Sequence, residues 1–205
     1  MNVDENESYL NVSSWISSRN EANDLAISFA RSLRAPEFHW FFIQGAQAIQ
    51  AGLYVSGLSC LLNGVEASIR VTMAQLEQPQ WQHDKLTPYR VLSNKLIRQA
   101  RDAGMPVEHL ALPKEKDFDI KLVSEKPNQV DVEIVRLRNN ICHGNVLEYI
   151  NRDMGDASLF FTPECLRQES AWLLAVCRCW ASALGTFREN MFVSIRDQSL
   201  TESVG

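Results

Sequence analysis

The sequence predicts an all-α fold, and three observations support this prediction. Apolar residues recur at helical spacing along most of the chain. A Thr followed directly by Pro, which is typical of a helix start, occurs at Thr87-Pro88 and again at Thr162-Pro163. The chain has 205 residues, 45% hydrophobic and 22% charged, which is ordinary for one globular domain. We therefore expect one up-and-down bundle of about four to five main helices over residues 21–190, with polar tails at 1–20 and 191–205.

The first expected elements are apolar helices. Residues 21–33 predict a short amphipathic helix with Leu25, Phe29 and Leu33 on one face. The stretch from about 37 to 77 predicts one long helix, or two helices joined near its glycines.

Part of this stretch is long enough to cross a bilayer, because no charged residue occurs from Phe38 to Val65. It nevertheless contains Gln, His and Asn side chains and four glycines, and it lacks positive flanks and an aromatic belt. We expect a buried central helix with small residues at close contacts, and no membrane association.

The next expected helix has a basic side. Thr87-Pro88 provides its N-cap and first turn, and Gly104 and Pro106 end it. Its polar side is predicted to carry the following residues: Arg90, Asn94, Lys95, Arg98 and Arg101. This side is either an ordinary solvated surface or a track for an anionic substrate.

The second half of the chain contains two further expected helices. The charged stretch 112–128 contains two prolines and indicates an excursion or a short strand. Residues 130–143 predict a helix that Gly144 closes in the left-handed conformation. The last helix is expected from Thr162-Pro163 to near Asn190, with an apolar band wide enough for burial inside a bundle or across a dimer interface.

Composition limits the classes of function. The five cysteines are odd in number and form no paired framework, and the N-terminus shows no secretory signal, so reduced thiols in the cytoplasm are expected. No CxxC or HExxH spacing is present, so we expect neither a metal site nor a cofactor. The net charge of -5 argues against a general nucleic-acid binder, so any such contact must be local.

The most informative stretch runs from Arg138 to His143 and reads Arg-Asn-Asn-Ile-Cys-His. A guanidinium can hold a phosphate with two hydrogen bonds, and an imidazole moves protons near pH 7. Together they can support metal-free phosphodiester cleavage. The spacing Arg-x4-His also occurs from Arg34 to His39, but there the Arg precedes Ala and a Pro interrupts the segment. Requiring a polar residue after the Arg leaves only the later segment.

Residues 132–145 resemble the signature of the HEPN superfamily, in which Arg, a polar residue, three or more residues of any type and His occur late in a small all-helical bundle. The segment 64–70 is also similar, and it places Glu66 where members often carry an acidic residue facing the site. The resemblance implies a HEPN-like bundle and a homodimer in which two motifs share one cleft.

The resemblance also implies an activity. Members with an intact motif are typically metal-independent endoribonucleases in toxin–antitoxin, phage-defence or RNA-processing systems. Other members are non-catalytic binders of RNA, a nucleotide or a protein. One toxin branch carries Tyr two residues after the His, where this chain has Asn145, so the chain departs from that branch.

In the implied reaction, His143 accepts the 2′ proton, its symmetry mate protonates the leaving oxygen, and Arg138 holds the non-bridging oxygens. Asn139 orients the His or contacts the phosphate. The product is a 2′,3′-cyclic phosphate, and the mechanism predicts selectivity for RNA because DNA lacks the attacking hydroxyl. The expected substrate is single-stranded RNA. The remaining candidate RNA contacts are Arg136, Asn140, Asn145, Arg90, Arg98 and Arg101.

Each site residue also has a structural interpretation. Arg138 either contacts substrate or pairs with Glu66. Glu66 can instead pair with Arg70 one turn along its own helix. His143 can act as a favoured cation at a helix C-terminus. The alternative functions are a non-catalytic HEPN-like module and an unrelated helical interaction protein, and a toxin would also have an antitoxin or regulatory protein as partner.

Overall fold

The computed structural model describes residues 17, 20, 21, 23–78, 86, 90–150 and 160–202, with side chains of the last helix as far as Val193. All regular structure in these residues is helical, which confirms the all-α prediction. The elements are a helix over 23–33, α2 (His39–Gln50), α3 (Tyr54–Glu77), α4 (Asn94–Asp102), η1 (Val107–Leu110), α5 (Phe118–Val123), α6 (Glu133–His143), η2 (Val146–Tyr149), η4 (Pro163–Leu166) and α7 (Arg167–Glu202). Most of the predicted N-terminal tail lies outside the described residues.

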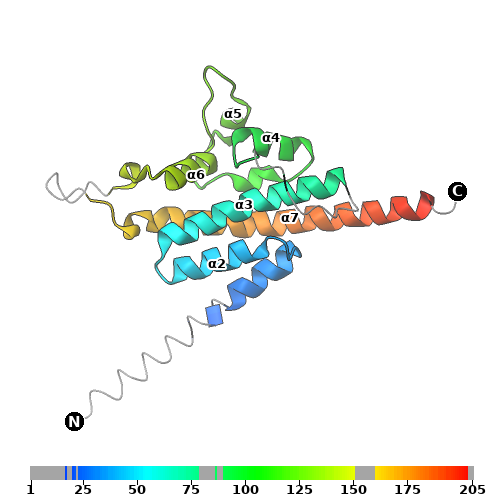
Figure 1. The fold of residues 1–205 in the computed structure, drawn as a ribbon, viewed down its shortest axis with the longest axis horizontal. Coiled ribbons are helices and arrows are strands. Elements are labelled where there is room, and N and C mark those ends of the chain that lie inside the picture. Colours follow the sequence, from blue (N-terminus) through cyan, green and yellow to red (C-terminus); the bar gives the residue numbers. More distant parts are fainter. Residues whose placement is uncertain are drawn as a thin grey trace, which may run out of the picture.

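Helix α3 lies at the centre of the molecule. It packs against α2, α4, α6 and α7. Figure 1 shows α2 and the helix over 23–33 on one side of α3, and α4, α5 and α6 on the other, while α7 runs along its length. Apolar side chains of α3 are fully buried, among them Leu58, Leu61 and Ile69. The indole of Trp180 on α7 donates to the hydroxyl of Ser68 at 2.9 Å, so α3 and α7 are joined by a buried hydrogen bond as well as by packing.

Glycines allow the backbones of neighbouring helices to approach closely. A Cβ on Gly57 of α3 would lie 2.4 Å from Cγ1 of Ile49 and 3.0 Å from the carbonyl oxygen of Gly45. A Cβ on Gly185 of α7 would lie 1.7 Å from the carbonyl oxygen of Ser32. The Gly57 contacts confirm that small residues serve close packing in the apolar stretch, which forms two helices joined at residues 51–53.

Among the described residues, one segment is long and apolar enough to cross a membrane. It spans Pro163–Val193 with a mean hydropathy of 1.2. Its side chains Leu173, Trp180 and Leu184 are fully buried in the core of the bundle. The core helix of a soluble protein passes the same test, so α7 gives no positive sign of a membrane span.

The structure corrects several expected boundaries. Helix α4 begins at Asn94, after Ser93, whose hydroxyl accepts from the backbone N–H of Leu96. Thr87 and Pro88, the predicted start, lie outside the described residues, and Arg90 precedes the helix. The strand considered for 112–128 is wrong, because that segment contains α5. Helix α6 begins three residues later than expected, and α7 continues past the expected end near 190 to Glu202.

Candidate functional site

Helix α6 carries the Arg-to-His motif and is fixed at both ends. At its start, the buried carboxylate of Glu115 accepts from the backbone N–H of Glu133 at 2.8 Å, which satisfies one of the free N–H groups of the first turn. At its end, Gly144 adopts φ 69° as the left-handed cap. The N–H of Asn145 then bonds to the carbonyl of Asn140 at 2.9 Å. The motif therefore occupies the last two turns of a short, closed helix.

Arg138 and Asn139 are linked by hydrogen bonds to an acidic residue before the helix. Nη1 of Arg138 donates to Oδ1 of Asn139 at 3.3 Å, and Nδ2 of Asn139 donates to Oδ2 of Asp131 at 3.2 Å. Arg138 is half-buried and forms no ion pair within the part of the chain that the structure describes. Its guanidinium keeps donors for an anion, because Asn139 uses one nitrogen only.

Asp131 was not recognised as a site residue from the sequence. The sequence places it inside the helix predicted over residues 130–143, whereas α6 begins at Glu133, so Asp131 lies just before the first turn and within reach of Asn139. Its other carboxylate oxygen accepts from Gln129 at 3.5 Å. Asp131 therefore fixes the rotamer of Asn139 from outside the motif.

His143 lies exposed in the last turn of α6. It has no hydrogen bond or ion pair to any described residue. It lies five positions after Arg138, which on an ideal helix corresponds to roughly 140° of rotation and roughly 7.5 Å of rise. The structure does not bring these two side chains of one chain into contact.

Two asparagines of the predicted site hold the loop after α6 in place. Asn140 is buried, and its Nδ2 donates to Oε2 of Glu148 and, at 3.1 Å, to Oη of Tyr149. Its Oδ1 accepts from Nδ2 of Asn145 at 3.0 Å. The hydrogen bonds of these two amides thus hold η2 against α6.

Arg136 has acidic partners that Arg138 lacks. It forms an ion pair with Glu133 at 2.6 Å and another with Glu148. Because two helical positions differ by about 200°, Arg136 lies on the other side of α6 from Arg138. The structure therefore separates these two cations.

Glu66 has a structural role. Its carboxylate accepts from Nη1 of Arg70 at 3.2 Å and from the backbone N–H of Leu92 at 2.7 Å. No contact with Arg138 is present among the described residues. Of the two pairings considered for Glu66, the structure has the one along its own helix, and it adds a bond to the segment before α4.

Three of the four cations on the predicted basic side lie near an acidic residue. Arg90 is 3.7 Å from Glu77, Arg98 is 3.8 Å from Glu125, and Arg101 is 3.8 Å from Asp102. These long, partly exposed pairs leave the cations able to exchange partners.

Asn94, predicted to lie on this polar side, is fully buried instead. Its amide donates to the carbonyls of Lys121 and Val130 and accepts from the N–H of Val132. Because it satisfies backbone groups of two distant segments, it fixes α4 to the start of α6.

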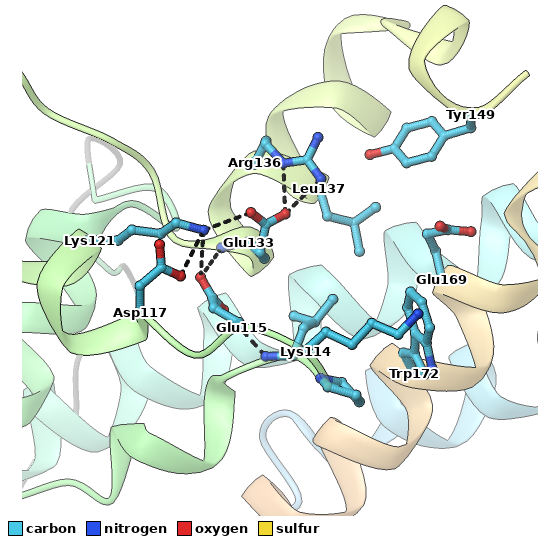
Figure 2. Close-up of a pocket in the computed structure, with 12 residues that line it drawn as sticks. Lys114, Glu115, Asp117, Lys121, Glu133, Arg136, Leu137, Tyr149, Glu169 and Trp172 are labelled. Atoms are coloured by element: carbon cyan, nitrogen blue, oxygen red, sulfur yellow. Dashed lines mark hydrogen bonds and ion pairs between the residues drawn. The ribbon is translucent and has the colours of Figure 1, made fainter.

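The side of α6 that carries Glu133 and Arg136, opposite Arg138, faces a cavity with an ionic cluster at one end (Figure 2). Lys121 lies 2.9 Å from Glu133, 3.3 Å from Asp117 and 3.6 Å from Glu115. Burial lowers the pKa of the Lys121 ammonium, but hydrogen bonds to Glu133 and Asp117 outweigh burial, so this pKa is raised.

The pKa values of two carboxyls in the cluster shift in opposite directions. Burial raises the pKa of Glu115, against the bonds from the N–H groups of Glu133 and Leu112. Burial also acts to raise the pKa of Glu133, but the hydrogen bonds from Lys121 and Arg136 prevail and lower it. Glu133 is therefore ionised to lower pH than Glu115.

No family model matches the chain, and the searches of curated proteins and of solved structures find no match either. What the site does is accordingly argued from its own residues.

Proposed function

We propose that this protein is a metal-independent endoribonuclease of the HEPN type, cleaving single-stranded RNA in the cytoplasm in a toxin or phage-defence role. The observation that carries the proposal is the end of α6. There Arg138 has no carboxylate partner among the described residues, Asn139 is oriented by Asp131, and His143 is exposed. A guanidinium free of acids favours a phosphate ligand.

The chemistry requires one base and one acid. The 2′-oxygen attacks phosphorus while its proton passes to the imidazole of His143, and the bond from phosphorus to the 5′-oxygen breaks. That oxygen leaves as a hydroxyl after taking a proton from an imidazolium. Arg138 stabilises the charge that builds on the non-bridging oxygens.

The motif supplies one histidine per chain, so a second copy is needed to provide both groups. This requirement supports a homodimer in which two α6 ends share a cleft. It also accounts for the separation of Arg138 and His143 within one chain, since each can act with a residue of the partner subunit. In a toxin role, the further partner would be an antitoxin or another regulatory protein.

The experiment is cleavage of a mixed-sequence single-stranded RNA by purified protein in EDTA. His143→Ala should abolish cleavage, and Arg138→Ala should slow it by about 100- to 1,000-fold. The exposed residues Arg178 and His109 provide matched controls, because Arg178→Ala and His109→Ala should retain the wild-type rate. Cleavage that survives His143→Ala, or that requires added Mg²⁺, contradicts the mechanism.

A non-catalytic RNA-, nucleotide- or protein-binding module is the second candidate. It is favoured by one observation: Arg138 and His143 of one chain do not contact each other, and neither of them lines the cavity beside α6. The two candidates differ in one measurement. A binding module retains its RNA affinity in His143→Ala and gives no product with the wild type.

A further inference from the structure

The cavity beside α6 lies away from the motif and has a volume of about 210 Å³. It is bounded by the first half of α6, the start of α7, η2 and the turn that contains Lys114 (Figure 2). Its lining combines apolar and charged side chains. In the end formed by the ionic cluster, Lys121 and Arg136 are paired with Glu115, Asp117 and Glu133, so that end has no free charge to offer.

The other end of the cavity contains two charged side chains that form no hydrogen bond or ion pair with any residue the structure describes. Lys114 and Glu169 both lie beside Trp172, and the Lys114 ammonium is 4.7 Å from the centre of the indole ring. Neither Lys114 nor Glu169 has a hydrogen bond or ion pair to a described residue. One cation and one carboxylate thus face the same hollow without neutralising each other.

The surfaces between these two charges are apolar or aromatic. Leu137 and the rings of Tyr149 and Trp172 line this end. The Tyr149 hydroxyl oxygen accepts a bond from Asn140, which leaves its own proton available to a ligand. Burial raises the pKa of Tyr149, so the phenol stays protonated.

The backbone of Lys114 has an uncommon conformation. Its φ of 83° lies in the left-handed region, which is costly for a residue with a Cβ and persists only where the surroundings impose it. Here Glu115 imposes it: its buried carboxylate binds the N–H groups of Leu112 and Glu133, and its own N–H bonds to the carbonyl of Leu112. The turn therefore fixes the backbone from which the Lys114 side chain reaches Trp172.

The volume limits the size of the occupant. Sites for drug-sized ligands span roughly 300–1,000 Å³, and a water molecule occupies about 30 Å³ of liquid. A cavity of about 210 Å³ lies below the range for drug-sized ligands and fits a molecule with the bulk of several waters.

We propose that this cavity binds a small zwitterion, an α-amino acid with an apolar or aromatic side chain. Its carboxylate pairs with Lys114, its ammonium with Glu169 and the Tyr149 ring, and its side chain packs on Trp172 and Leu137. Each unsatisfied charge of the cavity then has a partner of opposite sign. This site does not depend on the proposed ribonuclease activity.

The test is calorimetric titration of the full chain with L-leucine and L-phenylalanine. Two analogues each lack one charge: L-leucinamide has no carboxylate and N-acetyl-L-leucine has no ammonium. At least one of the two amino acids should bind, and both analogues should bind at least tenfold more weakly than that amino acid. Tenfold corresponds to about 1.4 kcal/mol.

Variants assign the charges to residues. Lys114→Met and Glu169→Gln should each weaken amino-acid binding at least tenfold, while Lys116→Met, an exposed neighbour that does not line the cavity, should bind as the wild type does. Circular dichroism melts establish that each variant is folded. No binding of either amino acid at millimolar concentration overturns the proposal, and so does equal binding of leucine and its two analogues.

Discussion

At the scale of single residues, the surroundings of two arginines decide which can bind a substrate. Arg136 is held by Glu133 and Glu148, whereas Arg138 contacts only the neutral amide of Asn139 among the described residues. An ion-paired guanidinium must lose its partner before it binds phosphate, and a guanidinium on a neutral amide does not. Arg138 is accordingly the expected phosphate ligand.

Arg138→Ala should lower the RNA cleavage rate by about 100- to 1,000-fold, by analogy with the loss of one oxyanion donor. It should leave the free energy of unfolding within about 0.5 kcal/mol of the wild-type value, because no ion pair is lost. Arg136→Ala should instead lower the free energy of unfolding by about 1 kcal/mol. It should reduce the cleavage rate far less than Arg138→Ala does. Urea denaturation and single-turnover cleavage separate the two effects. If Arg136→Ala proves the more damaging to cleavage, this assignment of roles is wrong.

Glu133→Gln should reveal a pH-dependent contribution from the ionic cluster. Hydrogen bonds from Lys121 and Arg136 lower the pKa of Glu133 despite burial, so in the folded state it binds its proton less readily than in the unfolded chain. Its contribution is therefore present above the ordinary pKa of 4.5 and is lost as pH falls through the lower folded value.

The wild type should exceed the Glu133→Gln variant in stability by about 1 kcal/mol at pH 7, and the difference should shrink as pH falls below 4.5. Urea denaturation of both proteins at pH 7 and pH 3.5 measures it. A difference that stays constant over this range would contradict the role given to Glu133.

At the scale of elements, the sequence predicts a helix end only where the residues that form this end are close together in the chain. Gly144 predicts the end of α6 because the left-handed cap needs only its own backbone. The start of α4 is different. Asn94 is buried through bonds to Lys121, Val130 and Val132, residues 27 to 38 positions away, and no periodicity reveals such partners.

Asn94→Ala should lower the free energy of unfolding by about 3 kcal/mol, because it leaves buried backbone groups of two segments without partners. Asn63→Ala, an exposed asparagine on α3, should change stability by less than about 0.5 kcal/mol. Chemical denaturation of the two variants provides the comparison. Equal, small effects would mean that the α4–α6 connection contributes little.

At the scale of the whole molecule, the packing around α3 and α7 holds the bundle together. The all-α class and the glycine contacts of the apolar stretch were predictable, since they follow from periodicity and from small residues in a long apolar segment. The candidate site was predictable in part: the motif marks Arg138, Asn139 and His143, but Asp131 is recognised only through its contact with Asn139. The cavity beside Trp172 was not predictable, because its walls come from elements distant in sequence.

Gly185→Ala tests this packing. The added Cβ would lie 1.7 Å from the carbonyl oxygen of Ser32, so the helix over 23–33 must move, at an expected cost of about 3 kcal/mol. Gly52→Ala is the matched control, because its φ of 76° is strained but nothing lies within 4 Å of the new atom, and it should cost about 1 kcal/mol. Thermal melts of both variants give the ranking, and a smaller loss for Gly185→Ala would show that α7 does not pack there so closely.

The central claim is that the end of α6 cleaves RNA without a metal. Its most direct test is the identity of the 3′ ends formed when single-stranded RNA is incubated with the wild-type protein in EDTA. We predict 2′,3′-cyclic phosphate ends that are absent with His143→Ala and present with His109→Ala. Intact RNA, or 3′-hydroxyl ends, would contradict the ribonuclease mechanism.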